Sequence, residues 1–324
     1  MSISRREFLG TTTLGVTAGP LLAAKGDKAA MPTRVLGKTG ARVSILAFGS
    51  GSRFLKYEED QAAEALTRAL DHGITYIDTA DDYGKNHLSE QRVGKAIKGR
   101  RQGLFLATKL SNRDGKESRR IVEESLKALR VDQVDLIHIH SLASLDDLDK
   151  IEAKGGVLEQ LRKIKEQKLT RFIGITCHAD PEALQAALEH NDFDVTQMAL
   201  NAGQVNMKSG KGSMVPNDAI KTSFQQLALP VANRKKMGVI AMKVMAQDAL
   251  IGQVSAEKLL QYSLSLSVTA CVVGMPKFEH IDENIKLAKA FKPMTPPEMK
   301  QLSAPLSERN KQALDRFFAD HVDA

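Results

Sequence analysis

The sequence has 324 residues, of which 42% are hydrophobic and 26% are charged, so wholesale disorder and a collagen-like fibre are excluded. Lys and Arg outnumber Asp and Glu by 46 to 39, a formal net charge of +7. The basic residues are dispersed and lack the aromatic interleaving or recognition motif of nucleic-acid-binding modules, so we expect no nucleic-acid partner. The length suits one large α/β barrel or two ordinary domains.

The chain contains two cysteines, Cys177 and Cys271, and each lies within an apolar run. Two separated thiols cannot build a disulfide framework, and thiolates alone cannot hold a zinc ion or an iron–sulfur cluster here. Stability therefore has to come from the hydrophobic core.

The first residues contain the pair Arg5-Arg6, followed by Phe8-Leu9 and an uncharged, mildly apolar stretch that ends at Ala24. This order of features resembles a twin-arginine secretion signal. The apolar stretch is too short and too rich in Thr and Gly to remain as a membrane span. We predict a signal peptide over residues 1–24 that is read by the twin-arginine export machinery, and a periplasmic mature protein. The alternative is an ordinary N-terminus that happens to contain two arginines.

A polar linker over residues 25–33 precedes the folded unit, which we expect over residues 34–324. The segment Arg34–Val43 has two short stretches around Lys38-Thr39-Gly40 and predicts a β-hairpin. Apolar runs then alternate with amphipathic stretches of helical period. The eight strand–helix pairs are Ser44–Ser50 with Glu58–His72, Thr75–Ala80 with Ser89–Lys98, Leu104–Leu110 with Ser118–Leu129, Val134–Ser141 with Val157–Gln167, Arg171–Cys177 with Pro181–His190, Val195–Asn201 with Phe224–Lys236, Gly238–Val244 with Ala256–Leu266, and Ala270–Pro276 with Ile281–Phe291.

Eight such units in roughly 250 residues predict an α/β fold of the (β/α)8 TIM-barrel type, with an N-terminal hairpin and a C-terminal helical extension. A doubly wound open sheet is the alternative, although it usually has fewer units and a Gly-rich first turn. Two segments fall outside the repeat. Ala202–Ser223 reads as a long loop after the sixth strand, and the tail from Met294 adds a helix at Glu308–His321. Both are candidates for covering the mouth of the barrel.

Polar residues close several of the predicted strands. Asp78 ends the second strand, and Lys109 ends the third, where its burial requires a compensating anion that Asp78 can supply. His138 and His140 share one face of the fourth strand, with His140 nearer the mouth. Active sites of such barrels lie at the C-terminal ends of the strands, so we expect these side chains to form one site.

Several segments fall on these strands in an order that resembles the aldo-keto reductase superfamily. They are Asp78-Thr79-Ala80 with Tyr83-Gly84, Ala107-Thr108-Lys109, the run Asp135 to His140, Gln197 to Asn201, and Glu283-Asn284. The resemblance covers the chain from Arg34 to about Phe291. It implies reduction of an aldehyde or ketone by an NAD(P)H-dependent oxidoreductase, with Asp78, Tyr83, Lys109 and His140 as the catalytic tetrad.

Physical chemistry agrees with these implied roles. When a hydride reaches a carbonyl carbon, charge develops on the oxygen, and a nearby group has to donate a proton. We expect Tyr83 to be this general acid, with Lys109 lowering the pKa of its phenol toward the working range. Asp78 would keep Lys109 charged and in place, and His140 would orient the carbonyl. His138 competes for this last role, but we expect it to be a buried structural residue one layer down.

The resemblance implies a nicotinamide dinucleotide held without a Gly-x-Gly-x-x-Gly motif, and the chain lacks that motif after its first strand. Expected contact residues near the reactive end are Ser50, Gly51, Thr176, Gln197, Met242 and Lys243. Cys177 stands where the family usually has an asparagine, and Met242 where it commonly has an aromatic residue. Lys243 is expected to lean toward the pyrophosphate.

At the adenosine end, the resemblance implies contacts from Glu283 and Asn284. NADPH-preferring members place a lysine, a serine and an arginine around the 2′-phosphate, but this chain has Gly274, Met275 and His280 at the aligned positions. Lys277 is a candidate substitute. Because a phosphate needs fixed cations or several donors, we expect NADP(H) but keep NAD(H) as possible.

Two other functions remain open. A cofactor-binding regulatory member of the same fold would keep the nucleotide with weak catalysis, and a metal-dependent barrel hydrolase would use the His138-x-His140 pair. The substrate is not specified beyond a small carbonyl compound. Residues nominated around the mouth are Lys85, Asn206, Met207 and Lys208.

Overall fold

The computed structural model describes residues 30–209, 214–217 and 222–319. The predicted signal peptide over residues 1–24 lies outside the described residues, as does most of the predicted linker. Met31 already packs in the core, and the first strand begins at Thr33. Across the described ranges, no helix is both long enough and apolar enough to cross a membrane.

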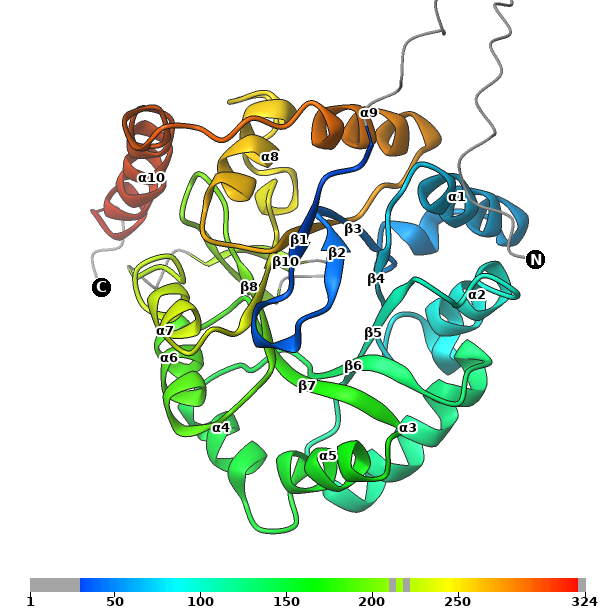
Figure 1. The fold of residues 1–324 in the computed structure, drawn as a ribbon. Helices are drawn as coiled ribbons and strands as arrows, with labels where there is room; N and C mark the ends of the chain where they lie inside the picture. The colour runs from blue at the N-terminus through cyan, green and yellow to red at the C-terminus, as the bar shows by residue number, and fades with distance from the viewer. Residues whose placement is uncertain (1–29, 210–213, 218–221, 320–324) are drawn as a thin grey trace, which may run out of the picture.

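Eight parallel strands form a closed barrel, which confirms the predicted (β/α)8 fold (Figure 1). The strands are β3 (Leu46–Gly49), β4 (Tyr76–Asp78), β5 (Phe105–Leu110), β6 (Val134–Ile139), β7 (Thr170–Cys177), β8 (Val195–Ala199), β11 (Gly238–Met242) and β12 (Ala270–Val273). Each strand pairs with the next in the chain, and β12 pairs with β3 to close the barrel.

Helices surround the barrel, as Figure 1 shows. They are α1 (Glu59–Asp71), α2 (Leu88–Ala96), α3 (Gly115–Leu129), α4 (Leu145–Glu152), α5 (Val157–Glu166), α6 (Pro181–His190), α7 (Ala228–Arg234), α8 (Ala256–Ser265), α9 (Phe278–Lys289) and α10 (Pro296–Ala319). Several of these helices have a side-chain N-cap. At the start of α6, Asp180 accepts hydrogen bonds from the backbone N–H groups of Glu182 and Ala183, and Pro181 occupies the first helical position. Helix α4 was not predicted.

Alternation along each strand sorts side chains between the barrel interior and the helices. On β4 and β5, Tyr76 and Phe105 stack inside the barrel, 5.1 Å between ring centroids, while Ile77 and Leu106 face the surrounding core. The same alternation places Asp78 and Lys109 inside, one layer nearer the C-terminal ends of these strands.

The N-terminal hairpin lies across one end of the barrel (Figure 1) and consists of β1 (Thr33–Val35) and β2 (Arg42–Ser44). Leu36 of its turn is fully buried and packs with the interior side chains. The adjacent Gly37 has φ of +49°, and a Cβ there would lie 2.2 Å from the backbone nitrogen of Gly238, where β11 starts. The hairpin thus closes the N-terminal ends of the strands and leaves the opposite end open.

The segment expected as a long loop contains a second hairpin, of β9 (Asn206–Ser209) and β10 (Met214–Asn217). The backbone N–H of Met207 donates to the carbonyl of His178, 2.7 Å, which attaches this hairpin to the end of β7. Asn206 and Met207 are buried rather than exposed at the mouth, because the hairpin packs on a cluster that includes Tyr262 and Leu306. Helix α10 begins earlier than predicted and contributes Leu306 to that cluster.

Candidate active site

A cavity of about 610 Å³ opens at the C-terminal ends of the barrel strands. All four residues of the predicted tetrad line it. The residues that line the cavity also include Gly51, Arg53, Asp82, Ser141, His178, Gln197, Met242, Lys243, Asp248 and Gly274. The cavity lies where active sites of this barrel type are found.

Lys109 is the centre of the hydrogen-bond network at the floor of the cavity. Its Nζ donates to Asp78 Oδ2 at 2.7 Å, to the carbonyl of Thr79 at 2.7 Å and to the Tyr83 hydroxyl at 3.2 Å. Lys109 is 1% exposed and Asp78 3% exposed, so this is a buried ion pair. The three donations use all the protons of the ammonium group, which fixes its position beneath the Tyr83 hydroxyl.

The electrostatics of this pair modify one expectation. Burial opposes charge on Lys109, but the adjacent Asp78 and Tyr83 outweigh burial and raise the pKa of the lysine. The pKa of Tyr83 is raised as well, because burial and the Asp78 charge outweigh the opposing effect of Lys109. We expected Lys109 to lower the pKa of Tyr83; in this geometry the lysine charge is already compensated by the carboxylate.

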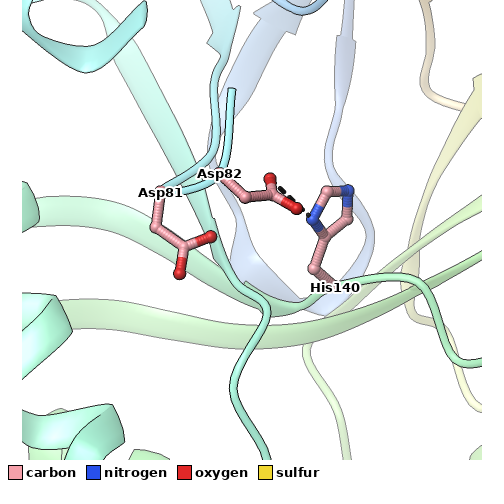
Figure 2. Close-up of side chains that lie close together, drawn as sticks. All are labelled: Asp81, Asp82 and His140. Carbon is pink, nitrogen blue, oxygen red and sulfur yellow. Dashed lines mark ion pairs between the residues drawn. The ribbon is translucent and has the colours of Figure 1, made fainter. Parts of the chain in front are cut away.

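His140 stands next to Tyr83, with 5.5 Å between the ring centroids and 76° between the ring planes. Figure 2 shows the Asp82 carboxylate against the ring, and His140 Nδ1 lies 3.2 Å from Asp82 Oδ1. Burial works against a charge on Asp82, but the hydrogen bond and the charge of His140 lower the pKa of this carboxyl to about 2. The Ser111 hydroxyl contacts the same Nδ1 at 3.1 Å and donates to Asp81 at 2.9 Å.

The other histidines of the site are held neutral. His138 is fully buried below the cavity, and burial together with Lys109 lowers its pKa well below the usual range. Burial and the charges of Lys243 and His140 lower the pKa of His178 to about 3. In the described ranges, the one group of three potential metal-ligand side chains here is Asp81, Asp82 and His140, within 4.8 Å of one another (Figure 2). It does not contain His138, on which the hydrolase interpretation depended.

Four of the predicted cofactor residues line the cavity: Gly51, Gln197, Met242 and Lys243. Gln197 donates from Nε2 to Asp78 Oδ2 at 3.4 Å, while its buried Oε1 has no hydrogen-bond partner among the described residues. Gly51 allows the Tyr83 ring to pack against the backbone, because a Cβ at this position would lie 3.2 Å from Tyr83 Cε2. Met242 Sδ lies 3.7 Å from Gln197 Nε2.

Lys243 follows the last residue of β11 and has a left-handed backbone conformation, with φ of +57°. Its ammonium group has no ion-pair partner in the described part of the chain, although it is mostly enclosed by the cavity. Burial and the charges of Lys109 and Arg53 lower the pKa of Lys243 to about 8.

Two predicted cofactor residues lie beneath the cavity rather than on its wall. Ser50 is fully buried and donates its hydroxyl proton to the carbonyl of Asp78 at 2.7 Å. Thr176 is buried too, and its Oγ1 accepts a hydrogen bond from the backbone N–H of Ser141 at 2.8 Å. Both side chains therefore support the strand ends.

The predicted adenosine-end residues stand on or just before α9, away from the cavity wall. Lys277 and Glu283 are exposed. Asn284 is 8% exposed and donates to the carbonyl of His280 at 2.7 Å, while its Oδ1 is buried without a partner in the described residues. The sequence analysis missed Arg53 and Asp248, which line the cavity and form an ion pair across its rim.

A family model described as the aldo/keto reductase family matches residues 46–258. The oxidoreductase YqkF of Bacillus subtilis is 28% identical over 316 residues, which cover 85% of this chain and 96% of that protein. L-galactose dehydrogenase of Arabidopsis thaliana is 29% identical over 293 residues, which cover 78% and 86% of the two chains.

Solved structures show the same fold. An aldo-keto reductase from Bacillus halodurans superimposes with a TM-score of 0.66 at 24% identity, covering 85% of this chain and 96% of that one. An aldo-keto reductase from Klebsiella pneumoniae in complex with NADPH gives a TM-score of 0.66 at 21% identity, covering 86% and 95%. At these identities the likeness establishes the barrel architecture.

Proposed function

Because the chain belongs to the aldo/keto reductase family of NAD(P)H-dependent oxidoreductases, we propose that it reduces an aldehyde or ketone to an alcohol at the cavity described above. The observation that carries this proposal is the contact of Lys109 Nζ with both Asp78 and the Tyr83 hydroxyl. The contact places a proton donor and a fixed cation together at the C-terminal ends of the barrel strands. Carbonyl reduction needs both at the oxygen on which charge develops.

Tyr83 acts as the general acid. Its raised pKa keeps the phenol protonated at neutral pH, so the donor form is the resting form. An alkoxide is a much stronger base than a phenolate, so the transfer of the proton to the reduced oxygen stays favourable. Lys109 then stabilises the phenolate that remains, at 3.2 Å from the tyrosine oxygen, and Asp78 holds the lysine in place.

The residues around the cavity fit a nicotinamide dinucleotide, which supplies the hydride when it is bound. Gln197 has a buried, unpartnered Oε1 that would accept a hydrogen bond from a carboxamide, and Asn284 has an equivalent Oδ1 that would meet the adenine. Lys243 is a cation without a counter-ion in the described chain, and it would compensate the pyrophosphate. Met242, on the cavity wall, would cover a face of the nicotinamide ring.

We propose NADP(H) as the cofactor, with NAD(H) as the alternative. The relative from Klebsiella pneumoniae is in complex with NADPH. Lys277 is the exposed cation nearest in sequence to the positions where NADPH-preferring members hold the 2′-phosphate. Its replacement by Met should weaken NADPH binding and leave NADH binding unchanged.

The test is a fluorescence titration of the purified protein with NADPH and with NADH, followed by a carbonyl panel with the nucleotide that binds. The panel includes aldoses, because one relative is an L-galactose dehydrogenase. Tyr83→Phe should reduce turnover by at least about a hundredfold and keep nucleotide binding. Unchanged turnover would refute the mechanism, and binding without turnover in the wild type would favour the regulatory alternative.

We also propose that residues 1–24 direct export by the twin-arginine route and that the mature barrel works in the periplasm. The Arg5-Arg6 pair and the apolar stretch after it support this proposal. Fractionation of cells that produce the full chain should place the processed protein in the periplasm. Replacement of both arginines by lysine should leave it unprocessed in the cytoplasm, and an unchanged distribution would exclude this route.

A further inference from the structure

The proton on His140 Nδ1 can be located from its neighbours. Asp82, with a pKa of about 2, is an ionised acceptor at 3.2 Å from this nitrogen. The Ser111 hydroxyl lies 3.1 Å from the same nitrogen, but its own proton is donated to the Asp81 carboxylate at 2.9 Å. Both neighbours of Nδ1 therefore act as acceptors toward it, and Nδ1 has to carry a proton.

This assignment restricts what the other ring nitrogen can do. A neutral imidazole has one N–H, so a proton on Nδ1 leaves Nε2 as an acceptor. An acceptor cannot donate a hydrogen bond to a carbonyl oxygen. Figure 2 shows that this second nitrogen is turned away from both carboxylates. His140 can therefore bind a carbonyl oxygen beside Tyr83 only when both of its nitrogens are protonated.

The charges that face His140 favour the doubly protonated ring. Asp81 and Asp82 approach from the loop after β4, and a carboxylate oxygen of each lies within 4.8 Å of a ring nitrogen of His140. Lys109 of β5 is already paired with Asp78. Arg113, from the loop after β5, donates to the backbone carbonyl of His140 at 2.9 Å and is paired with Asp147. Lys243 lines the same cavity, and its charge acts on His178. Tyr83, His138 and His178 are neutral at physiological pH. The two carboxylates are thus the charged groups next to Nδ1, and Asp82 supplies the direct contact.

We propose that Asp82 is a positioning residue that holds His140 as an imidazolium, so that its Nε2–H donates a charge-assisted hydrogen bond to the carbonyl oxygen. The proposal rests on the proposed carbonyl reduction and names the form in which His140 takes part. Such bonds are roughly twice as strong as neutral ones. Because the pKa of Tyr83 is raised, the phenol holds its proton firmly. The Nε2–H of His140, as a second donor, polarises the carbonyl before the phenol gives up that proton.

The test is Asp82→Asn, because the asparagine carbonyl can still accept the hydrogen bond from Nδ1 while the negative charge is removed. The alkaline limb of the kcat/KM profile for reduction should move to lower pH by about one unit, and kcat/KM at neutral pH should fall about tenfold. NADPH affinity should not change. The matched control is Asp192→Asn, which removes the same charge from an exposed ion pair with Lys38 in the turn of the N-terminal hairpin, at the opposite end of the barrel. It should behave as the wild type.

A second readout does not depend on turnover. NMR spectra of protein with ¹⁵N-labelled histidine report whether both His140 nitrogens are protonated, and the His140→Gln variant assigns the signals. The wild-type ring should keep both protons to a higher pH than the ring in Asp82→Asn. If the wild type reduces no carbonyl, the proposed function fails, and this measurement still decides the role of Asp82. An identical titration in both proteins, or an equal loss of activity at every pH, would overturn the proposal.

Discussion

Replacement of Lys109 by Met tests the buried ion pair that supports the site. Lys109 is 1% exposed and Asp78 3% exposed, and after the change Asp78 Oδ2 keeps only the 3.4 Å contact with Gln197 Nε2. Removal of one partner from a buried pair costs about 3–5 kcal/mol, because it leaves an uncompensated charge. At this chain length each kcal/mol lowers Tm by about 2 °C, so we expect a fall of about 6–10 °C without cofactor. The assay is thermal unfolding followed by circular dichroism.

The double variant Asp78→Asn with Lys109→Met separates charge from packing. It removes both charges and keeps the side-chain volumes similar, so we expect it to recover most of the lost stability while both variants stay inactive. The reasoning would be wrong if Lys109→Met unfolded within about 2 °C of the wild type, or if the double variant were as unstable as the single one.

Three further outcomes follow from particular side chains. Lys243 has a pKa of about 8 and loses its charge as the pH rises through that value, so NADPH affinity in a fluorescence titration should fall about tenfold between pH 7 and 9.5. Lys243→Met should bind NADPH more weakly and with an affinity that does not depend on pH over this range. A parallel decline in both proteins would contradict the assigned role of Lys243. Gly37→Ala should lower the free energy of unfolding, measured by thermal unfolding, by about 1–3 kcal/mol, which is more than the loss expected for Gly40→Ala. Both glycines have positive φ, but of these two positions it is Gly37 at which a Cβ would lie against backbone atoms. Equal losses in the two variants would refute the steric argument. Burial raises the pKa of the Cys177 thiol to about 12 and also raises the pKa of the Cys271 thiol. Neither thiol should therefore react with Ellman's reagent at pH 8 until the protein is unfolded, and rapid labelling of the native protein would refute their enclosure.

The barrel could be predicted from the sequence because each strand is buried on both faces and forms an apolar run between amphipathic stretches. The two segments that were missed are short. Helix α4 spans eight residues, with Leu148 and Ile151 on its buried face and the acidic pair Asp146-Asp147 in its first turn. The β9–β10 hairpin depends on its contact with the His178 carbonyl, which local sequence does not encode. The conformation of such segments is determined by tertiary contacts.

The meeting of Asp78, Lys109 and His140 at one end of the barrel could be predicted, because parallel strands bring their C-terminal ends together and a lysine that ends a buried strand requires an anion nearby. Tyr83 was expected beside them only from the resemblance to the aldo-keto reductases. The contacts that His140 makes could not be predicted from the sequence. They depend on the course of the loop after β4, which turns Asp82 toward the ring, and on Ser111 beyond the end of β5. The direction of the Tyr83 pKa shift was also beyond the sequence, since it is the difference between burial and two opposing charges.

Within the part of the chain that the structure describes, the pairing of charges inside the cavity leaves one cation unmatched. Lys109 is matched by Asp78, and Arg53 is matched by Asp248 across the rim. Asp82 is matched by His140 when that ring carries two protons. Among the described cavity residues this leaves Lys243 as the cation without an anion, and burial together with the charges of Lys109 and Arg53 lowers its pKa. A pyrophosphate beside Lys243 would restore its charge, so nucleotide binding should take up protons above pH 8.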